Sequence, residues 1–161
     1  MADHDPRIES LNEQGYETMS KEYYNDEEAL DEAKENLKQA QNAAEWIFLQ
    51  RQMESNMQLL IERFYYSLYY CMVGILTLKT NEKFKRHESA INAFNYLIYS
   101  TDYLDHSFVA SISILRGLRE EYDYHDADID EEKYLLAEKL WNESYPELEN
   151  ELISLIQQKE K

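Results

Sequence analysis

Apolar residues recur every three or four positions along most of the chain, which is the spacing that gathers them on one face of an α-helix. The pattern predicts successive helices at about 26–50, 54–79, 90–100, 104–123 and 130–143. No segment alternates between apolar and polar residues as a strand would. The sequence therefore predicts an all-α protein, an up-and-down bundle of four to five helices. The helix at 54–79 is apolar around much of its circumference, so we expect it to be central and buried.

Several residues mark where these helices begin and end. Asn25 followed three residues later by Glu28 is a capping box, which predicts a helix start near residue 26. Pro146 is expected to end or kink the helix that begins near residue 130. Ser144 and Glu147 repeat the capping spacing and predict a final helix that reaches about residue 158.

Length and composition indicate one domain. The 161 residues suffice for a single core, and residues 1–25, which lack apolar periodicity, predict a flexible acidic arm before a helical bundle at 26–161. Only three Gly and two Pro favour long helices. One Cys, no secretory signal and no long apolar stretch predict a cytoplasmic protein without a membrane segment.

The negative charge is unevenly distributed. The chain carries −17 overall, with 12 acidic and 3 basic residues in 1–36, 7 and 8 in 37–118, and 14 and 5 in 119–161. Such a field opposes nonspecific binding to a phosphate backbone, which depends on many Lys and Arg side chains. Any contact with RNA is therefore expected to be local, or to need a basic partner.

The candidate chemistry lies near the end of the fourth predicted helix. The chain has no Gly-rich phosphate loop, no HExxH motif and no His/Cys cluster, so we expect neither a metal nor a cofactor. What remains is Arg119 followed six residues later by His125. On an unbroken helix these two side chains would lie on different faces, so they can converge only if the helix ends between them. The Asp-rich sequence after Tyr124 favours such an end.

Three motifs in order resemble the HEPN superfamily (higher eukaryotes and prokaryotes nucleotide-binding), in its small stand-alone prokaryotic branch. They are the Arg-apolar-Tyr-Tyr run at 63–66, the basic loop that leads to a His at 85–87, and the Arg-x-x-x-Asp-Tyr run at 119–124. The resemblance spans about residues 28–145. It implies a HEPN-like bundle and a homodimer in which two copies of the last motif face each other.

The resemblance also implies a metal-independent endoribonuclease of the toxin-antitoxin type. Arg119 and His125 would be its catalytic pair. A His that titrates near neutral pH can accept the proton of a ribose 2′-hydroxyl, and an Arg can hold the phosphate oxygens. The candidate substrate-binding residues are Arg63, Tyr124, Lys85, Arg86 and His87.

Two other interpretations stay open. The chain can be a non-catalytic nucleotide- or RNA-binding HEPN partner of a small nucleotidyltransferase, the antitoxin that the resemblance implies. It can also be a structural bundle without a ligand. Arg119 and Asp123 are spaced for an ion pair within one helix, and Glu120 follows the Arg where active members often have Asn, Asp or His, so a purely structural role for this motif remains an alternative.

Overall fold

The computed structural model describes residues 21–51, 57–125 and 131–161, with the side chains of 122–125 left out. The helices in these ranges are α2 (Asp26–Arg51), α3 (Met57–Thr80), α4 (His87–Thr101), α5 (Ser107–His125) and α6 (Glu131–Glu160). Apart from one antiparallel bridge between Tyr23 and Glu82, the described residues contain no strand. The predicted all-helical bundle is confirmed.

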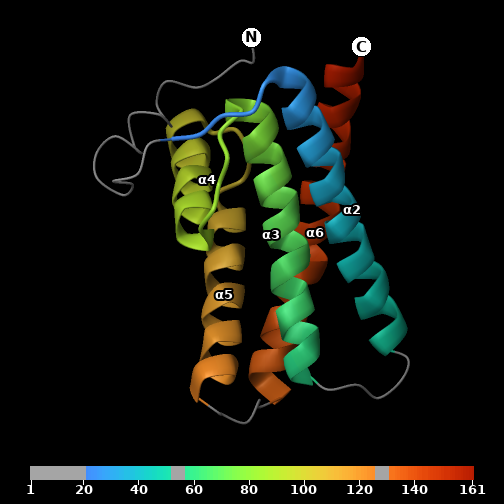
Figure 1. Ribbon diagram of the computed structural model, residues 1–161. Coiled ribbons are helices and arrows are strands. Elements are labelled where there is room, and N and C mark those ends of the chain that lie inside the picture. The colour runs from blue at the N-terminus through green and yellow to red at the C-terminus, as the bar shows by residue number, and fades with distance from the viewer. Residues whose placement is uncertain (1–20, 52–56, 126–130) are drawn as a thin grey trace.

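Four long helices alternate in direction, and a short one is added at the side. In Figure 1, α2, α3, α5 and α6 run alternately down and up, while α4 lies beside the upper part of α3. His87 at the start of α4 stacks on Tyr69 in the middle of α3, and Tyr103 just beyond α4 lies under Lys79 near the end of α3. The connection at 81–86 therefore runs back along α3, and α4 then runs in the same direction as α3.

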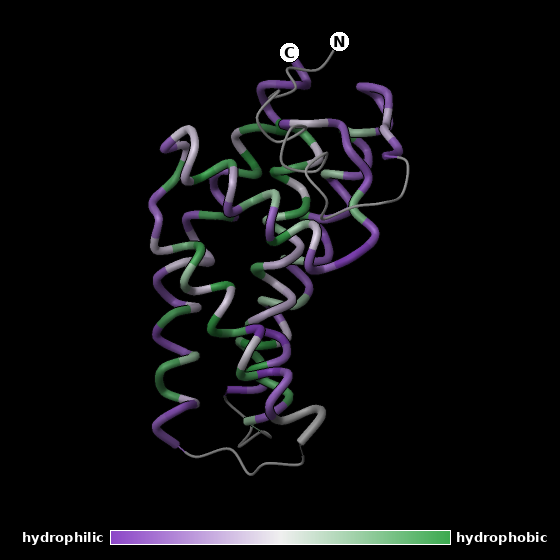
Figure 2. The backbone as a smooth tube through the Cα atoms, turned by 90° about the vertical axis from the view of Figure 1, so that its left-hand side faces the viewer, coloured by the Kyte–Doolittle hydropathy of each residue, from purple (hydrophilic) through white to green (hydrophobic). Residues whose placement is uncertain are grey.

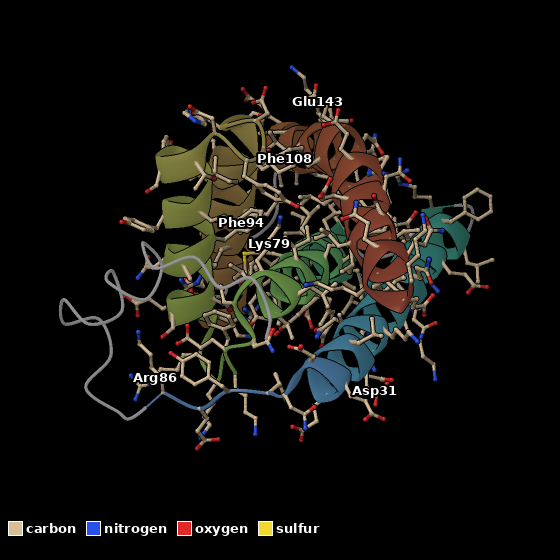
Figure 3. All side chains as sticks on the ribbon, turned by 90° about the horizontal axis from the view of Figure 1, so that it is seen from above. Asp31, Lys79, Arg86, Phe94, Phe108 and Glu143 are labelled. Atoms are coloured by element: carbon tan, nitrogen blue, oxygen red, sulfur yellow. The ribbon has the colours of Figure 1, made fainter. Side chains whose placement is uncertain are left out.

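Helix α3 is the centre of the bundle, as predicted. It packs against α2, α4, α5 and α6, and most of its side chains are buried, among them Phe64, Leu68 and Met72. The tube in Figure 2 shows apolar and polar positions following one another along the helices, as amphipathic helices require. Seen from above, Phe94 and Phe108 point into the bundle, while Asp31, Arg86 and Glu143 lie at its outside (Figure 3).

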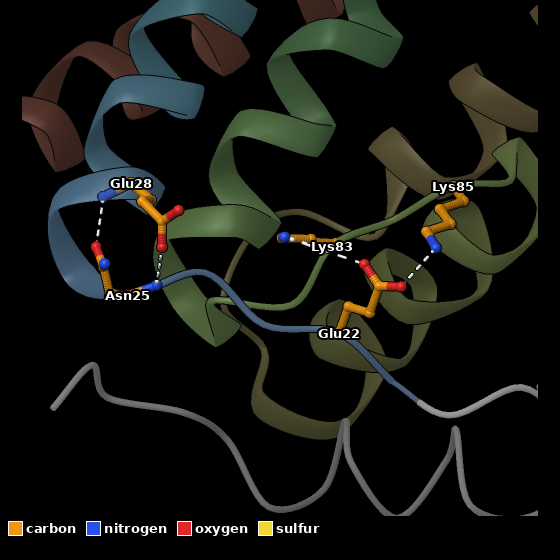
Figure 4. A network of polar contacts seen from close by, with 5 residues as sticks. All are labelled: Glu22, Asn25, Glu28, Lys83 and Lys85. Atoms are coloured by element: carbon orange, nitrogen blue, oxygen red, sulfur yellow. Dashed lines mark hydrogen bonds and ion pairs between the residues drawn. The ribbon is translucent and has the colours of Figure 1, made fainter.

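The predicted capping box at the start of α2 is confirmed. The Glu28 backbone N–H donates to Asn25 Oδ1 at 2.8 Å, and the Asn25 N–H donates to Glu28 Oε1 at 3.0 Å (Figure 4). Two backbone donors at the helix start are thus satisfied by side chains of the same turn. The helix begins at Asp26, where the sequence indicated.

The last part of the predicted N-terminal arm is attached to the connection between α3 and α4. The Tyr24 N–H donates to the Asn81 carbonyl at 2.7 Å, and the Lys83 N–H donates to the Glu22 carbonyl at 2.8 Å. The Glu22 carboxylate also pairs with Lys85 at 2.8 Å (Figure 4). Residues 1–20 of the predicted arm lie outside the described residues, whereas 22–24 form a short two-stranded contact.

Pro146 does not end the helix, and the prediction of two separate helices there is wrong. Helix α6 continues through Pro146 as one element. Proline removes one backbone donor, so the carbonyl of Asn142 one turn earlier loses its helical partner. Both residues are exposed, so water can reach that carbonyl. On the other side, the buried Tyr145 and Leu148 hold both halves of the helix against the core.

Candidate functional site

Helix α5 runs through His125, which changes the geometry expected of the Arg119/His125 pair. The helix was expected to end between these residues, but it continues from Ser107 to His125 without a break. Six residues correspond to about 600° of rotation, so the two positions are separated by about 120° around the helix axis. The side chains of Tyr124 and His125 lie outside the described ones. Within one chain, Arg119 and His125 therefore start from different faces of the same helix.

Arg119 instead lies over the paired tyrosines of α3. Its Cζ is 5.0 Å from the ring centroid of Tyr66 and 5.4 Å from that of Tyr65. Tyr65 is fully buried, while Tyr66 and Arg119 are half-buried. A guanidinium in this position is attracted by the electron-rich ring faces, which also fix the orientation of its planar group.

His87 joins this arrangement from α4. Its Nδ1 lies 2.8 Å from the Tyr65 hydroxyl, and its ring stacks on Tyr69 at a centroid distance of 4.0 Å and an angle of 16°. Tyr66 meets the imidazole edge-on at 5.8 Å. We call Tyr65, Tyr66, Tyr69, His87 and Arg119 the Arg119 cluster. Helices α3, α4 and α5 each contribute to it, so three elements fix its geometry.

The surroundings of His87 favour a neutral imidazole. Burial, and then the nearby Arg119 and Arg116 guanidinium groups, hold the pKa of His87 below its ordinary value, while Glu120 acts in the opposite direction. Burial also raises the pKa of Tyr65, so its hydroxyl stays protonated. When that hydroxyl donates to Nδ1, the neutral ring carries its own proton on Nε2.

The lowered pKa predicts a pH dependence of stability. The unfolded chain binds a proton at His87 near pH 6.5, before the folded protein does, so the contribution of His87 is complete above about pH 7 and is lost as the pH falls below that value. We expect wild type to lose more free energy of unfolding than His87→Gln between about pH 7.5 and 5.5. Urea unfolding of both proteins measures this. Parallel losses would show that His87 titrates normally.

Arg116 lies one turn before Arg119 but has an acidic partner on its own helix. Its Nε donates to Glu120 Oε1 at 3.0 Å. This contact has the four-residue spacing that supports ion pairs along a helix. Arg119 differs from Arg116 in lying over the rings of Tyr65 and Tyr66, and this position makes it the candidate for a contact with a ligand.

The other predicted substrate-binding residues whose side chains are described do not belong to the Arg119 cluster. Lys85 is exposed and paired with Glu22, and Arg86 is the residue immediately before α4. Arg63 lies over the ring of Trp46 from α2, with its Cζ 5.1 Å from the ring centroid. Within the basic run at 85–87, His87 belongs to the Arg119 cluster through its contacts with Tyr65 and Tyr69.

Two tyrosines of the cluster belong to the core, since Tyr65 is fully buried and Tyr69 is buried. Their part in holding His87 was not predicted. The four-residue spacing of Tyr65 and Tyr69 shows that they share a face. It does not show that the first residue of α4 would meet that face, because this depends on the path of the connection at 81–86.

Among the described residues, no group of three or more His, Cys, Asp or Glu side chains is placed to hold a metal ion. In the same part of the chain, no helix combines the length and apolar character needed to cross a membrane. Cys71 is fully buried, and burial raises the pKa of its thiol, as expected for an inert cysteine.

Comparison with known proteins adds no further constraint. No family model, curated protein or solved structure matches the chain. Function is therefore inferred from the geometry of the Arg119 cluster and from the sequence motifs.

Proposed function

We propose that this chain is a HEPN-like protein that binds a phosphate group of a nucleotide or of RNA at the Arg119 cluster. The observation that carries the proposal is the position of the Arg119 guanidinium, half-buried 5.0 Å from the ring centroid of Tyr66 and close enough to His87 to lower its pKa. Three helices meet at this point, so the donors are held in place before a ligand arrives.

The residue types suit a phosphate. A guanidinium has five N–H donors in a planar fork, so a contact with one neighbouring group leaves donors for phosphate oxygens. His87, bonded to Tyr65 through Nδ1, can offer its Nε2 proton as a further donor. The half-buried Tyr66 provides a ring on which a base can stack.

The charge distribution supports a small, local site. Residues 37–118 are close to neutral, while the segments on both sides are strongly acidic. Long-range attraction to nucleic acid is therefore weak, and affinity must come from specific contacts. A single nucleotide or a short single strand fits this condition better than a duplex.

The geometry supports binding more than cleavage. An endoribonuclease that used Arg119 and His125 would need both groups at one phosphate, and in one chain they occupy different faces of α5. The Arg-x5-His activity therefore depends on a second copy in the homodimer that the resemblance implies. The non-catalytic interpretation needs no such assembly.

Titration with a short single-stranded RNA tests the proposal. We expect Arg119→Gln to bind a short oligouridylate about tenfold or more weakly than wild type, because hydrogen bonds to charged groups are among the stronger polar contacts. Isothermal titration calorimetry at low salt measures both affinities.

Lys139→Gln is the matched control, since it removes one positive charge from an exposed position on α6. We expect it to bind as wild type does. Equal affinities of wild type and Arg119→Gln would contradict the proposal. RNA fragments formed in the same samples with chelator present would favour the endoribonuclease, with His125→Ala as the deciding variant.

A further inference from the structure

A cavity of about 370 Å³ opens between α2 and α3, next to the Arg119 cluster. Its volume lies in the range of small-molecule sites, which is roughly 300–1,000 Å³. Its lining combines aromatic rings with side-chain amides and one guanidinium, from Gln39, Asn42, Trp46, Arg63, Tyr66 and Tyr70. The described side chains that line it include neither Arg119 nor any residue of the basic run at 85–87.

The lining residues suit a planar heterocycle. Trp46, Tyr66 and Tyr70 present rings on which the face of any base can stack. The amides of Gln39 and Asn42 can both donate and accept hydrogen bonds, as the polar edge of a base requires. Trp46 is held in place by the Arg63 guanidinium at 5.1 Å.

Tyr66 connects this cavity to the Arg119 cluster. It lines the cavity, and its ring also lies 5.0 Å from Arg119 Cζ. Glu62 and Arg63 both line the cavity, so their opposite charges offset each other and leave little net attraction for an anionic group there. A ligand with one charged end and one planar end would therefore place its anionic end at Arg119 and its planar end in the cavity.

We infer that the cavity between α2 and α3 receives the base of a nucleotide whose phosphate lies at Arg119. This inference rests on the proposed function. It adds a site for the base, which is the part of the ligand that distinguishes a nucleotide from other phosphates. It makes Trp46 and Tyr66 the stacking surface and Asn42 a contact for the edge of the base.

Two probes separate this inference from the proposed function. Ribose 5-phosphate offers the phosphate without a base, and uridine 5′-monophosphate adds the base at the same charge. By calorimetry on the full chain, we expect the nucleotide to bind about tenfold more tightly, the effect of one stacked base. In Trp46→Leu the two affinities are expected to become equal.

Tyr99→Leu, which changes an exposed aromatic residue on α4, is expected to keep the difference between the probes. Asn42→Ala changes an exposed position and provides a second test that does not depend on removing a large side chain; it is expected to reduce the difference. Equal binding of both probes to wild type would overturn the base site and leave the phosphate site standing. Binding of neither probe would overturn the proposed function as well.

Discussion

Replacing Phe64 with Ala is expected to lower the free energy of unfolding by about 3 to 5 kcal/mol. Phe64 is 0% exposed, at the point where α3 meets α6. Its ring lies 5.4 Å from that of Trp141 and 6.1 Å from that of Tyr134, and Arg51 covers it at 5.6 Å. Because neighbours close around it from several helices, they cannot collapse fully into the space that the ring leaves. Urea denaturation measures the loss.

Phe48→Ala provides the control with the same chemical change. Phe48 is 63% exposed near the end of α2, so its loss is expected to change stability by about 0.5 kcal/mol or less. A loss below about 1 kcal/mol for Phe64→Ala would contradict the central position of α3, because burial of this ring would then contribute little.

Gly74→Val is expected to destabilise the protein by about 2 to 3 kcal/mol. A Cβ atom at this position would lie 2.8 and 2.9 Å from the two terminal methyl carbons of Leu152 and 3.4 Å from Asn36 Cβ. Leu152 is fully buried, so it can move only by displacing other core side chains. The crowding therefore outweighs the gain of roughly 0.5 kcal/mol that a better helix former brings. Thermal and urea unfolding measure the result.

Gly117→Val is the matched substitution at an open site. A Cβ atom there meets nothing within 4 Å, and the position is exposed on α5. We expect a change within about 0.5 kcal/mol of wild type. If both glycine variants were equally stable, close packing of α3 against α6 at Gly74 would be refuted.

The local features of the fold were accessible from sequence. Apolar spacing located the helices, and Asn25 with Glu28 fixed the start of α2, because these signals depend on neighbours within one or two turns. The predicted helix end at Pro146 was wrong because it, too, was based on local signals alone. The local effect of the proline opposes a helix, but the buried residues on both sides stabilise one, and tertiary packing prevailed over propensity.

The site was only partly accessible. Arg119 and His87 were both identified as candidates, but as members of separate motifs. Their association depends on α4 starting beside the middle of α3, a contact between residues far apart in the chain. The end of α5 was placed too early, since capping signals locate helix ends only to within a few residues. The homodimer, the nucleotidyltransferase partner and the cytoplasmic location remain predictions.

The backbone pairing of residues 22–24 with 81–83 has a structural consequence for His87. This pairing joins the segment before α2 to the segment after α3, so the helical hairpin between them becomes a closed ring. His87 follows the ring by only a few residues. Its location is therefore anchored by residues 22–24, which precede α2, as well as by α4.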